Sequence, residues 1–491
     1  MVRAAAVAER AGLPSVSIVS TAFLEQAAVV ARGLGLPGLP LAEYPGVPMT
    51  DGPEALRAKV AALADEVVAG LAGTVGAPTA PAAAEPGPRD IVFRGSLDDV
   101  QEFFHRQLWS DGLPIVPPTI ARVERFLAHV PDRAPDEVVG VLRPDTRAAT
   151  VWSIAVNGVM AGCRPEFMPV LVAIVEALAD PEFRVQDAGS TPGWEPLVIV
   201  SGPVARALDF HHGQGVMRVG RRANTSVGRF VRLYLRNVAG LRIPPGAGDK
   251  GSIAATFHVA LAEDEAAARA LGWPTFGEEQ GFGPGESGVT VQSVVSASPP
   301  IYTAGTRARE HLEVLAEVFG QACAYWSFTG MKYGRWEPLL VLGPAVARVI
   351  AADGWSKDDV RRYLWEHATI PAGRAERYAW HLGSTAFSLA AQVAAGALPA
   401  AYAASPDPER PVRVFLRPEA IGLVVAGDPG RNQSRGYVSN HIQGGRVSRR
   451  VRVSLADARP PRGAFASEPP LTAARRGGSA ARGSSDAVDQ A

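Results

Sequence analysis

The stretch that decides the fold occurs twice: WEPLVIVSGPVAR at residues 194–206 and WEPLLVLGPAVAR at residues 336–348. Each copy predicts a buried strand, a Gly-Pro turn and a helix with proline near its first position. A helix with apolar residues at helical spacing precedes each copy, at 169–179 and 310–319. We therefore predict an internal duplication: a large two-lobed α+β domain with pseudo-twofold symmetry. A cleft between two such lobes would be a natural ligand site.

The first 74 residues follow a different pattern, in which helices alternate with short apolar strands. We predict helices at 4–11, 22–33 and 53–71 and strands at 15–20 and 39–43. Asp51 is available as the cap of the third helix. The alternation is typical of parallel α/β units, but two strands are too few to fill a parallel sheet with both faces covered. Residues 1–74 therefore read as the second half of a domain whose first half is missing.

Composition divides the rest of the chain. Residues 75–90 are rich in Ala and Pro and predict a linker, residues 91–454 form the large domain, and residues 455–491 predict a disordered tail. Hydrophobic residues make up 47% of the chain and charged residues 20%, which is typical of a globular protein. Lys+Arg and Asp+Glu both number 49, so we predict no nucleic-acid partner.

Two cysteines, Cys163 and Cys323, are too few for a secreted disulfide framework or for a zinc site with two nearby cysteines. A cytoplasmic location is the default expectation. The uncharged run from Leu382 to Pro406 is mostly Ala, Gly and Ser and is interrupted by Pro399, so we predict no membrane span.

A proline-rich loop, SDGLPIVPPT at residues 110–119, precedes a predicted helix at 120–129 that Thr119 can cap. The three prolines fix an extended path. The loop is either a structural entry into the domain or a rigid arm that places Asp111 at the edge of a pocket.

The segment NGVMAGCRPE, residues 157–166, surrounds Cys163 with small residues. A thiol close to Arg164 and to a helix start would have a lowered pKa and be nucleophilic. The alternative is an inert core cysteine, which is the common case. Cys323 lies at the end of an apolar helix and is predicted to be core.

The segment RRANTSVGR, residues 221–229, begins a predicted helix that runs through Asn237. Asn, Thr and Ser at a helix start are caps, and three arginines there suit a carboxylate or phosphate. Both interpretations stay open, with Asn224 and Arg229 as candidate anion ligands.

Scattered histidines are the weak candidates for a metal site. His211 and His212 are adjacent and so do not chelate as a helical pair would, and His258 lies apart from them. The GxGxxG string at 246–251 follows two prolines rather than a strand, so we reject it as a dinucleotide fingerprint. A metal-dependent hydrolase or lyase stays open as an alternative function, and the sequence identifies no cofactor.

Several long motifs resemble one known family. In the large domain they are DGLPIVPPT (111–119), NGVMAGCRPEFMPV (157–170), RRANTSVGR (221–229), ALAEDEAAARALGW (260–273), GFGPGESGVTVQ (281–292), LLVLGP (339–344) and IAADGWSKDDVRRYLWE (350–366). In the N-terminal segment they are ERAGLPSVSIVSTAF (9–23) and GLGLPGLPL (33–41). Together they resemble the UGSC family, bacterial proteins named for a selenocysteine- or cysteine-Gly-Ser-Cys motif in an N-terminal Rossmann-like domain.

The resemblance implies that residues 1–74 are the second half of that Rossmann-like domain. The motif that names the family is absent from this sequence. Three explanations stay open: a gene start placed too late, a first half supplied by a separate chain, or loss of the motif together with its chemistry.

The resemblance also implies a function. We expect an enzyme, or the large subunit of one, that uses thiol or selenol chemistry on a small anionic organic molecule, by reduction or by cleavage of a carbon–heteroatom bond. A non-catalytic binding or scaffold subunit is the alternative, and a homo-oligomer stays open.

Seven positions that fall in the large-domain motifs are the expected site residues. Cys163, Glu166 and Asp111 are the expected catalytic groups, and Asn157, Arg164, Asn224 and Arg229 the expected ligands of the anion.

Overall fold

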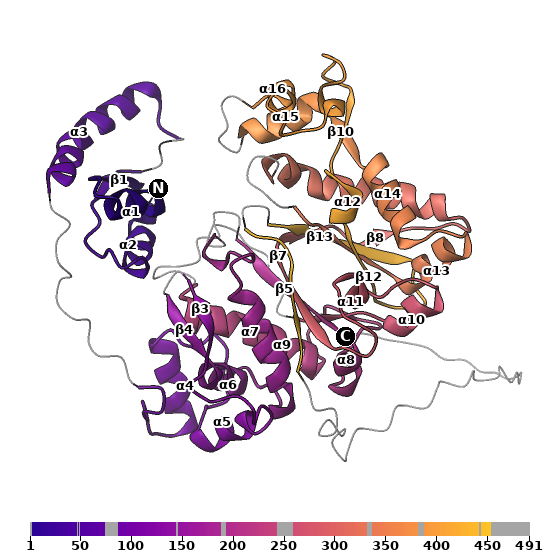
Figure 1. The fold of residues 1–491 in the computed structure, drawn as a ribbon, viewed down its shortest axis with the longest axis horizontal. Coiled ribbons are helices and arrows are strands. Elements are labelled where there is room, and N and C mark those ends of the chain that lie inside the picture. The colour runs from indigo at the N-terminus through magenta and orange to yellow at the C-terminus, as the bar shows by residue number, and fades with distance from the viewer. Residues whose placement is uncertain are drawn as a thin grey trace, which may run out of the picture.

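The structure is a computed structural model (Figure 1). It describes residues 2–46, 48, 50–73, 87–143, 146–187, 193–242, 259–330, 336–381, 387–440 and 443–452. No helix among these residues is both long enough and apolar enough to span a membrane.

The N-terminal segment has the alternating elements that its sequence predicts. They are α1 (Val2–Arg10), β1 (Ser17–Ser20), η1 (Thr21–Phe23), α2 (Leu24–Gly33), β2 (Leu41–Tyr44) and α3 (Pro53–Ala72). Strands β1 and β2 pair in parallel, with Ser17 opposite Leu41. The capping prediction is wrong, because Gly52 occupies the N-cap of α3. The Asp51 carboxylate instead accepts a hydrogen bond from Lys59 Nζ at 2.7 Å.

A helical layer follows in the chain. Its elements are α4 (Leu97–Arg106), α5 (Ile120–Leu127), β3 (Val138–Leu142), β4 (Arg147–Thr150), α6 (Val151–Met160), η2 (Pro165–Phe167), α7 (Met168–Leu178) and η3 (Val185–Asp187). Ser96 and Thr150 begin α4 and α6 with capping boxes, which satisfy backbone N–H groups that the first helical turn leaves unpaired. Thr119 occupies the N-cap of α5 without the predicted side-chain hydrogen bond.

One eight-stranded sheet forms the centre of the remainder. Its strands are β5 (Glu195–Ser201), β6 (Leu261–Ala262), β7 (Gly288–Ala297), β8 (Ile301–Tyr302), β9 (Leu339–Leu342), β12 (Gly422–Val425), β13 (Gln433–Ser439) and β14 (Val447–Arg450). The order along the sheet is β12-β9-β13-β7-β5-β6, with β14 on β7 and β8 on β13. A separate pair, β10 (Thr369–Pro371) and β11 (Pro411–Arg413), is antiparallel.

The helices of this part of the chain lie around the sheet, except α15 and α16, which lie beside β10 (Figure 1). They are α8 (Pro203–Ala207), α9 (Arg222–Tyr234), the π-helical turn η4 (Leu235–Ala239), α10 (Glu265–Ala270), α11 (Phe276–Glu279), α12 (Ala308–Gly330), α13 (Pro344–Ala352), α14 (Lys357–His367), α15 (Ala372–His381) and α16 (Leu389–Ala394), with short 3-10 turns η5 (Ala400–Ala403) and η6 (Pro418–Ala420).

The two copies of the sequence repeat lie in this single sheet, as β5 and β9. Strand β5 pairs in parallel with β6 and antiparallel with β7, and β9 pairs in the same way with β12 and β13. The centre is the antiparallel pair of β7 with β13. A twofold rotation about an axis between β7 and β13 would produce this pattern. The expectation of two separate lobes is corrected accordingly: the repeats occupy matching positions in two halves of one sheet.

The Gly-Pro turns of the repeat have a common structural cause. A Cβ on Gly202 would lie 2.1 Å from the carbonyl oxygen of Glu286, just before β7, and Gly202 has a φ of +84°. A Cβ on Gly343 would lie 2.3 Å from the carbonyl oxygen of Gln433, at the start of β13. Glycine is therefore required at both turns because the next strand of the same half passes against the backbone.

The sheet curls until its two edge strands approach each other. The backbone N–H of Asp264, just after β6, donates to the carbonyl oxygen of Val425 in β12 at 2.7 Å. One face of the sheet packs against the helices, and the other face encloses a smaller core that contains Leu197, Ile199 and Leu339. Alternate residues of β5 thus enter different cores, as strand geometry requires.

Candidate functional site

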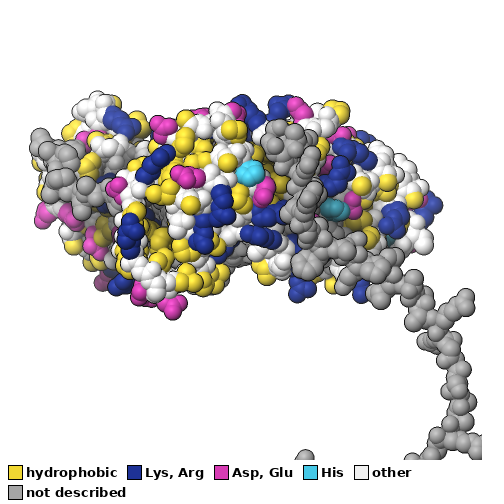
Figure 2. All heavy atoms as spheres, turned by 90° about the horizontal axis from the view of Figure 1, so that it is seen from below, with side chains coloured by type: hydrophobic (Ala, Val, Ile, Leu, Met, Phe, Trp, Pro, Cys, Tyr) yellow, Lys and Arg dark blue, Asp and Glu magenta, His cyan; other side chains and the backbone are white. Residues whose placement is uncertain are grey.

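A cavity of about 1160 Å³ lies in the helical layer. Its walls come from residues 87–95, α4, the loop before α5, α6 and the end of η4. Helix α6 contributes Trp152, Val156 and Met160, which are four residues apart and so share one helix face. Figure 2 views the molecule from below relative to Figure 1 and shows Lys and Arg side chains interspersed with hydrophobic ones on this side.

Arginines dominate the charge of the cavity. Its described lining contains one acidic residue, Asp90, against five arginines: Arg89, Arg94, Arg122, Arg147 and Arg242. Within the described ranges, Arg89, Arg94, Arg122 and Arg242 have no carboxylate ion-pair partner. The guanidinium of Arg89 lies 4.7 Å from the ring centre of Trp152. Because cations outnumber anions here, the cavity favours a negatively charged ligand.

Three polar atoms in the cavity wall have no hydrogen-bond partner among the described residues. They are Trp152 Nε1, Asn237 Oδ1 and Arg242 Nε, and all three are shielded from solvent. A buried polar group without a partner costs about 1–3 kcal/mol. These atoms lie behind the cavity surface rather than on it.

Asn157 and Asn237 form a linked pair beside the cavity. Asn157 Nδ2 donates to the carbonyl oxygen of Ser153 at 2.9 Å, and its Oδ1 accepts from Asn237 Nδ2 at 2.9 Å. Asn237 Nδ2 also donates to the carbonyl oxygen of Trp109 at 3.1 Å. Of the seven site residues expected from the sequence, Asn157 lines the cavity and the other six do not.

Positive charge also accumulates behind the cavity wall. Burial, followed by the charges of Arg242 and Arg232, lowers the pKa of Arg236 below its ordinary value. Like charges at short range disfavour one another unless a counterion intervenes. An anion bound near Arg242 would relieve this repulsion.

The loop at 110–119 is clamped rather than free. The Asp111 carboxylate accepts two hydrogen bonds from Arg229, from Nε and Nη2, both at 2.8 Å. Burial acts to raise the pKa of Asp111, but the hydrogen bonds and charge of Arg229 outweigh it, so the pKa is lowered. Arg229 Nη2 also donates to the carbonyl oxygen of Pro114 at 2.9 Å.

The Asp111 carboxylate and the Arg229 guanidinium neutralise each other. Their expected roles in proton transfer and anion binding stay predictions. Together they hold the loop whose later residues, Pro117 to Thr119, form part of the cavity wall.

Cys163 does not have the lowered pKa that its sequence context predicted. It is buried between α6 and η2, and burial raises the pKa of its thiol to about 12. The hydrogen bond from Ser226 and the charges of Arg222 and Arg229 act in the opposite direction but are outweighed. Desolvation disfavours the thiolate, so Cys163 packs as a core thiol. Cys323 is buried as well, and burial raises the pKa of its thiol.

The other expected site residues take structural positions. Arg164 donates to the carbonyl oxygen of Leu208 at 3.1 Å and lies over the ring of Phe167. Asn224 is buried; its Oδ1 accepts from the backbone N–H of His211 and its Nδ2 donates to the carbonyl oxygens of His211 and Ala260. Glu166 lies outside the cavity, and its buried Oε2 has no partner within the described part of the chain.

The histidine candidates do not assemble a metal site in the described part of the chain. His211 Nε2 contacts the carbonyl oxygen of Gln214 at 2.6 Å, and His212 Nδ1 lies 3.6 Å from Asp264. His258 falls outside the described residues. Within those residues no three His, Cys, Asp or Glu side chains gather as metal ligands would.

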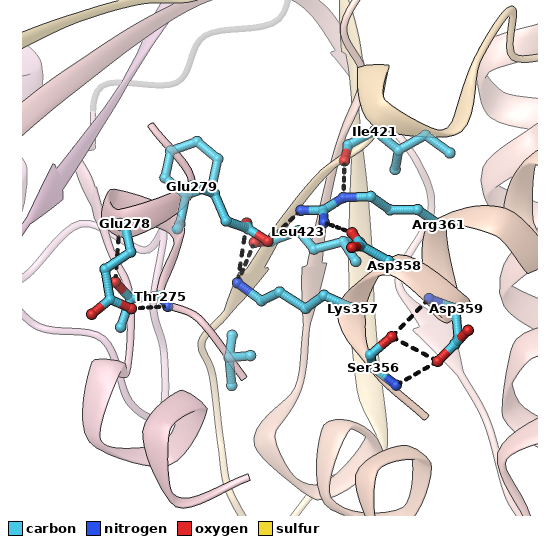
Figure 3. Close-up of polar contacts among 12 residues, drawn as sticks. Thr275, Glu278, Glu279, Ser356, Lys357, Asp358, Asp359, Arg361, Ile421 and Leu423 are labelled. Carbon is cyan, nitrogen blue, oxygen red and sulfur yellow. Dashed lines mark hydrogen bonds and ion pairs between the residues drawn. The ribbon is translucent and has the colours of Figure 1, made fainter. Parts of the chain in front are cut away.

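A second cavity of about 310 Å³ lies where β5 and β6 end. Next to it, Lys357 Nζ lies 3.5 Å from Glu263 Oε1. It also lies 3.3 Å from Glu279 Oε2 and donates to the carbonyl oxygen of Leu423 (Figure 3). Burial raises the pKa of Glu263 to about 7, although Lys357 acts to lower it. Glu263 also accepts from the backbone N–H of Val425, so it links the two sheet edges.

The carboxylates around this second cavity already serve the fold. Glu265 accepts from the backbone N–H of Gly202, Asp264 caps α10, and Glu278 completes the capping box of α11. The arginine-lined cavity is therefore the stronger candidate for a functional site.

Sequence reasoning missed most of the residues that line this larger cavity. Arg89 falls inside the predicted linker at 75–90, and Arg94, Arg122 and Arg242 occur singly rather than in a motif. A usable signal was the apolar segment 91–93 between Arg89 and Arg94, which a solvated linker does not need.

Comparison with known proteins gives one match. The model of the UGSC family matches residues 1–73. Comparison with curated proteins finds no match, and comparison with solved structures finds none. The family match covers the N-terminal segment of alternating helices and strands, and it does not cover the motifs of the large domain. Residues 1–73 of this chain therefore match the UGSC family.

Proposed function

We propose that this chain binds a small organic anion in the arginine-lined cavity and provides the ligand-binding part of a thiol- or selenol-dependent enzyme. The observation that carries the proposal is the group of four arginines without ion-pair partners in the described structure, which line one cavity together with Trp152. A carboxylate can form two parallel hydrogen bonds with a guanidinium, which is the strongest common recognition of that group.

The reaction expected of such an enzyme is reduction or cleavage of a carbon–heteroatom bond. Cys163 and Cys323 are the two cysteines of the sequence, and both are buried. The reactive thiol or selenol would therefore come from a UGSC motif outside this sequence, and a chain that supplies that half-domain would be the partner. A cytoplasmic location would keep such thiols reduced.

Burial of Cys163 also favours a second candidate, a binding subunit without catalysis. The two candidates share the anion site and differ in turnover. Adding a chain that carries the UGSC motif would produce turnover under the first candidate and leave a bound, unchanged ligand under the second.

Anion binding is tested by isothermal titration calorimetry with 3-phenylpropanoate, a carboxylate on an apolar body. We expect Arg242→Gln to weaken binding about tenfold, which corresponds to loss of one charged hydrogen bond. The matched control is Arg362→Gln, because Arg362 is an exposed arginine remote from the cavity lining. Unchanged affinity in Arg242→Gln, or no binding to the unsubstituted chain, would refute the proposal.

We further propose that the sheet arose by duplication and that residues 1–73 are part of a Rossmann-like domain. The repeated WEPL sequence and the matching strand pairings of β5 and β9 support the first statement. The parallel pair β1–β2 between helices supports the second. An experimental structure in which no rotation superposes the two halves of the sheet would contradict the duplication.

A further inference from the structure

We propose that the free edge of β1 is the docking site of the chain that supplies the UGSC half-domain. That chain adds a strand parallel to β1 and a helix beside α3. The proposal rests on the partner named in the proposed function and states where this partner binds. Anion binding in the arginine-lined cavity does not enter into it.

The backbone of β1 is paired on one side. In the described part of the chain β1 has one strand partner, β2, and the backbone N–H of Ser17 donates to the carbonyl oxygen of Pro40 at 3.1 Å. Successive residues of a strand direct their backbone groups to opposite sides, so the N–H and C=O of Ile18 point away from β2. An edge of this kind is a template for another strand.

The face of the sheet beneath α3 is covered over β2 but not over β1. Ile18 and Ala42 are opposite each other in the register of the two strands, so their side chains lie on the same face. Ala42 is fully buried in the core that it forms with Leu63 of α3, whereas Ile18 is 40% exposed. A second helix beside α3 would bury Ile18.

Helix α3 also carries apolar side chains that its own contacts leave exposed. They are Val60, Val68 and Leu71, which follow one another at helical spacing and share one flank of the helix. A surface helix normally turns its apolar side chains toward a core. Packing a helix of the partner against this flank and over Ile18 would remove both from water, which is favourable.

The position of α1 selects the edge of β1 rather than that of β2. Ala5 of α1 packs with Ala31 of α2 in a core separate from the one beneath α3, so α1 and α2 lie on the same face of the sheet. Crossovers between parallel strands are right-handed in about 98% of cases. Strand β1, α2 and β2 form one such unit, so a strand leading into α1 on that face belongs beside β1, on the side away from β2.

Co-expression tests the proposal. The full-length chain, with an affinity tag, is produced together with the motif-bearing half-domain of a cysteine-type UGSC protein, and the complex is isolated. Hydrogen exchange is read at single residues by mass spectrometry with electron-transfer fragmentation. In the free chain we expect the Ile18 amide to exchange at least about tenfold faster than that of Ser17, which is already hydrogen-bonded, and in the complex we expect this difference to close.

A substitution at the edge gives a second measurement. Replacing Ile18 with Lys places a charge on the edge strand, which is one way natural proteins keep such edges from pairing. We expect Ile18→Lys to abolish co-purification of the half-domain. The matched control is Val141→Lys, because Val141 is a 46% exposed aliphatic residue of β3, outside residues 1–73, and this variant should co-purify the half-domain as before.

The other outcomes overturn the proposal in distinguishable ways. Co-purification that survives Ile18→Lys, with unchanged exchange at Ile18, would overturn docking at β1 and leave the partnership intact. Protection of the Ile18 amide in the free chain that is lost on dilution would identify a second copy as the occupant. Failure of the half-domain to co-purify would overturn the docking site and the partner together, whereas calorimetry judges anion binding separately. Should Ile18→Lys not fold, exchange at Ile18 in the unsubstituted complex decides.

Discussion

The ion pair between Asp111 and Arg229 offers a direct test of how the cavity wall is held. Replacing Asp111 with Asn keeps the shape of the side chain but removes its charge and places an amide against the donors of Arg229. The side chain of Asp111 is 8% exposed and that of Arg229 is 17% exposed, so solvent compensates little for the loss.

The size of the effect follows from burial. Removing one partner of a fully buried ion pair costs about 3–5 kcal/mol. Arg229 keeps some solvent contact and its hydrogen bond to the carbonyl oxygen of Pro114, so we expect about 2–3 kcal/mol here. The stabilisation is present above the unfolded-chain pKa of Asp, about 3.9, and is lost as the pH falls through the lowered folded-state pKa.

Hydrogen exchange followed by mass spectrometry measures how often the loop at residues 110–119 opens. The backbone N–H of Ile115 donates to Gln101 Oε1, and that of Val116 donates to the carbonyl oxygen of Met160. If Asp111→Asn frees the loop, both amides exchange through local opening. An effect of 2–3 kcal/mol corresponds to exchange that is roughly 30 to 140 times faster.

The control is Glu102→Gln, which breaks the pair of Glu102 with Arg106, two exposed side chains 3.9 Å apart. Exposed pairs contribute about 0–1 kcal/mol, so exchange in the loop should barely change. Unaltered exchange of Ile115 and Val116 in Asp111→Asn would show that the pair does not hold the loop.

Three further predictions concern the core. Cys163 should react slowly with iodoacetamide in the folded chain, because burial raises the pKa of its thiol to about 12; rapid labelling seen by mass spectrometry would contradict this. Burial raises the pKa of Glu263 to about 7, so its contribution to stability is present below the unfolded pKa of Glu and lost as the pH rises through about 7. Between pH 5 and 8 the melting temperature of Glu263→Gln should therefore fall less steeply than that of the unsubstituted chain. Equal slopes in the two proteins would contradict a raised pKa of Glu263. Gly202→Ala should destabilise the protein by about 3 kcal/mol in urea unfolding, because the new Cβ would meet the carbonyl oxygen of Glu286 at 2.1 Å. Gly281→Ala has a similar positive φ but open space, so an equal loss in both variants would exclude the clash as the cause.

The sequence supports the local structure well. Runs such as 197–200 and 339–342 are apolar throughout, and a Gly-Pro turn follows each of them. These local features are enough to predict a buried strand, a turn and a helix. The parallel pairing of β1 with β2 was predictable for the same reason. The capping prediction for Asp51 was wrong because Gly52 occupies the N-cap of α3 and the Asp51 carboxylate pairs with Lys59 of the same helix.

The candidate site was far less accessible to sequence reasoning. Asp111 and Arg229 are separated by 118 positions, and nothing in either motif shows that the two charges cancel. The nucleophilicity of Cys163 was inferred from its neighbours in the chain, but its pKa depends on burial by elements remote in sequence.

The sequence alone thus determined the alternating N-terminal segment, its UGSC resemblance and the repeated strand-turn-helix unit, because these depend on patterns within a few tens of residues. The tertiary structure alone decided that both repeats share one sheet, that Asp111 and Arg229 neutralise each other, and that Arg242, Asn237 and Trp152 meet at one cavity. The reason is physical: charge pairing, desolvation and the enclosure of a cavity depend on distances in space, which the order of residues along the chain does not contain.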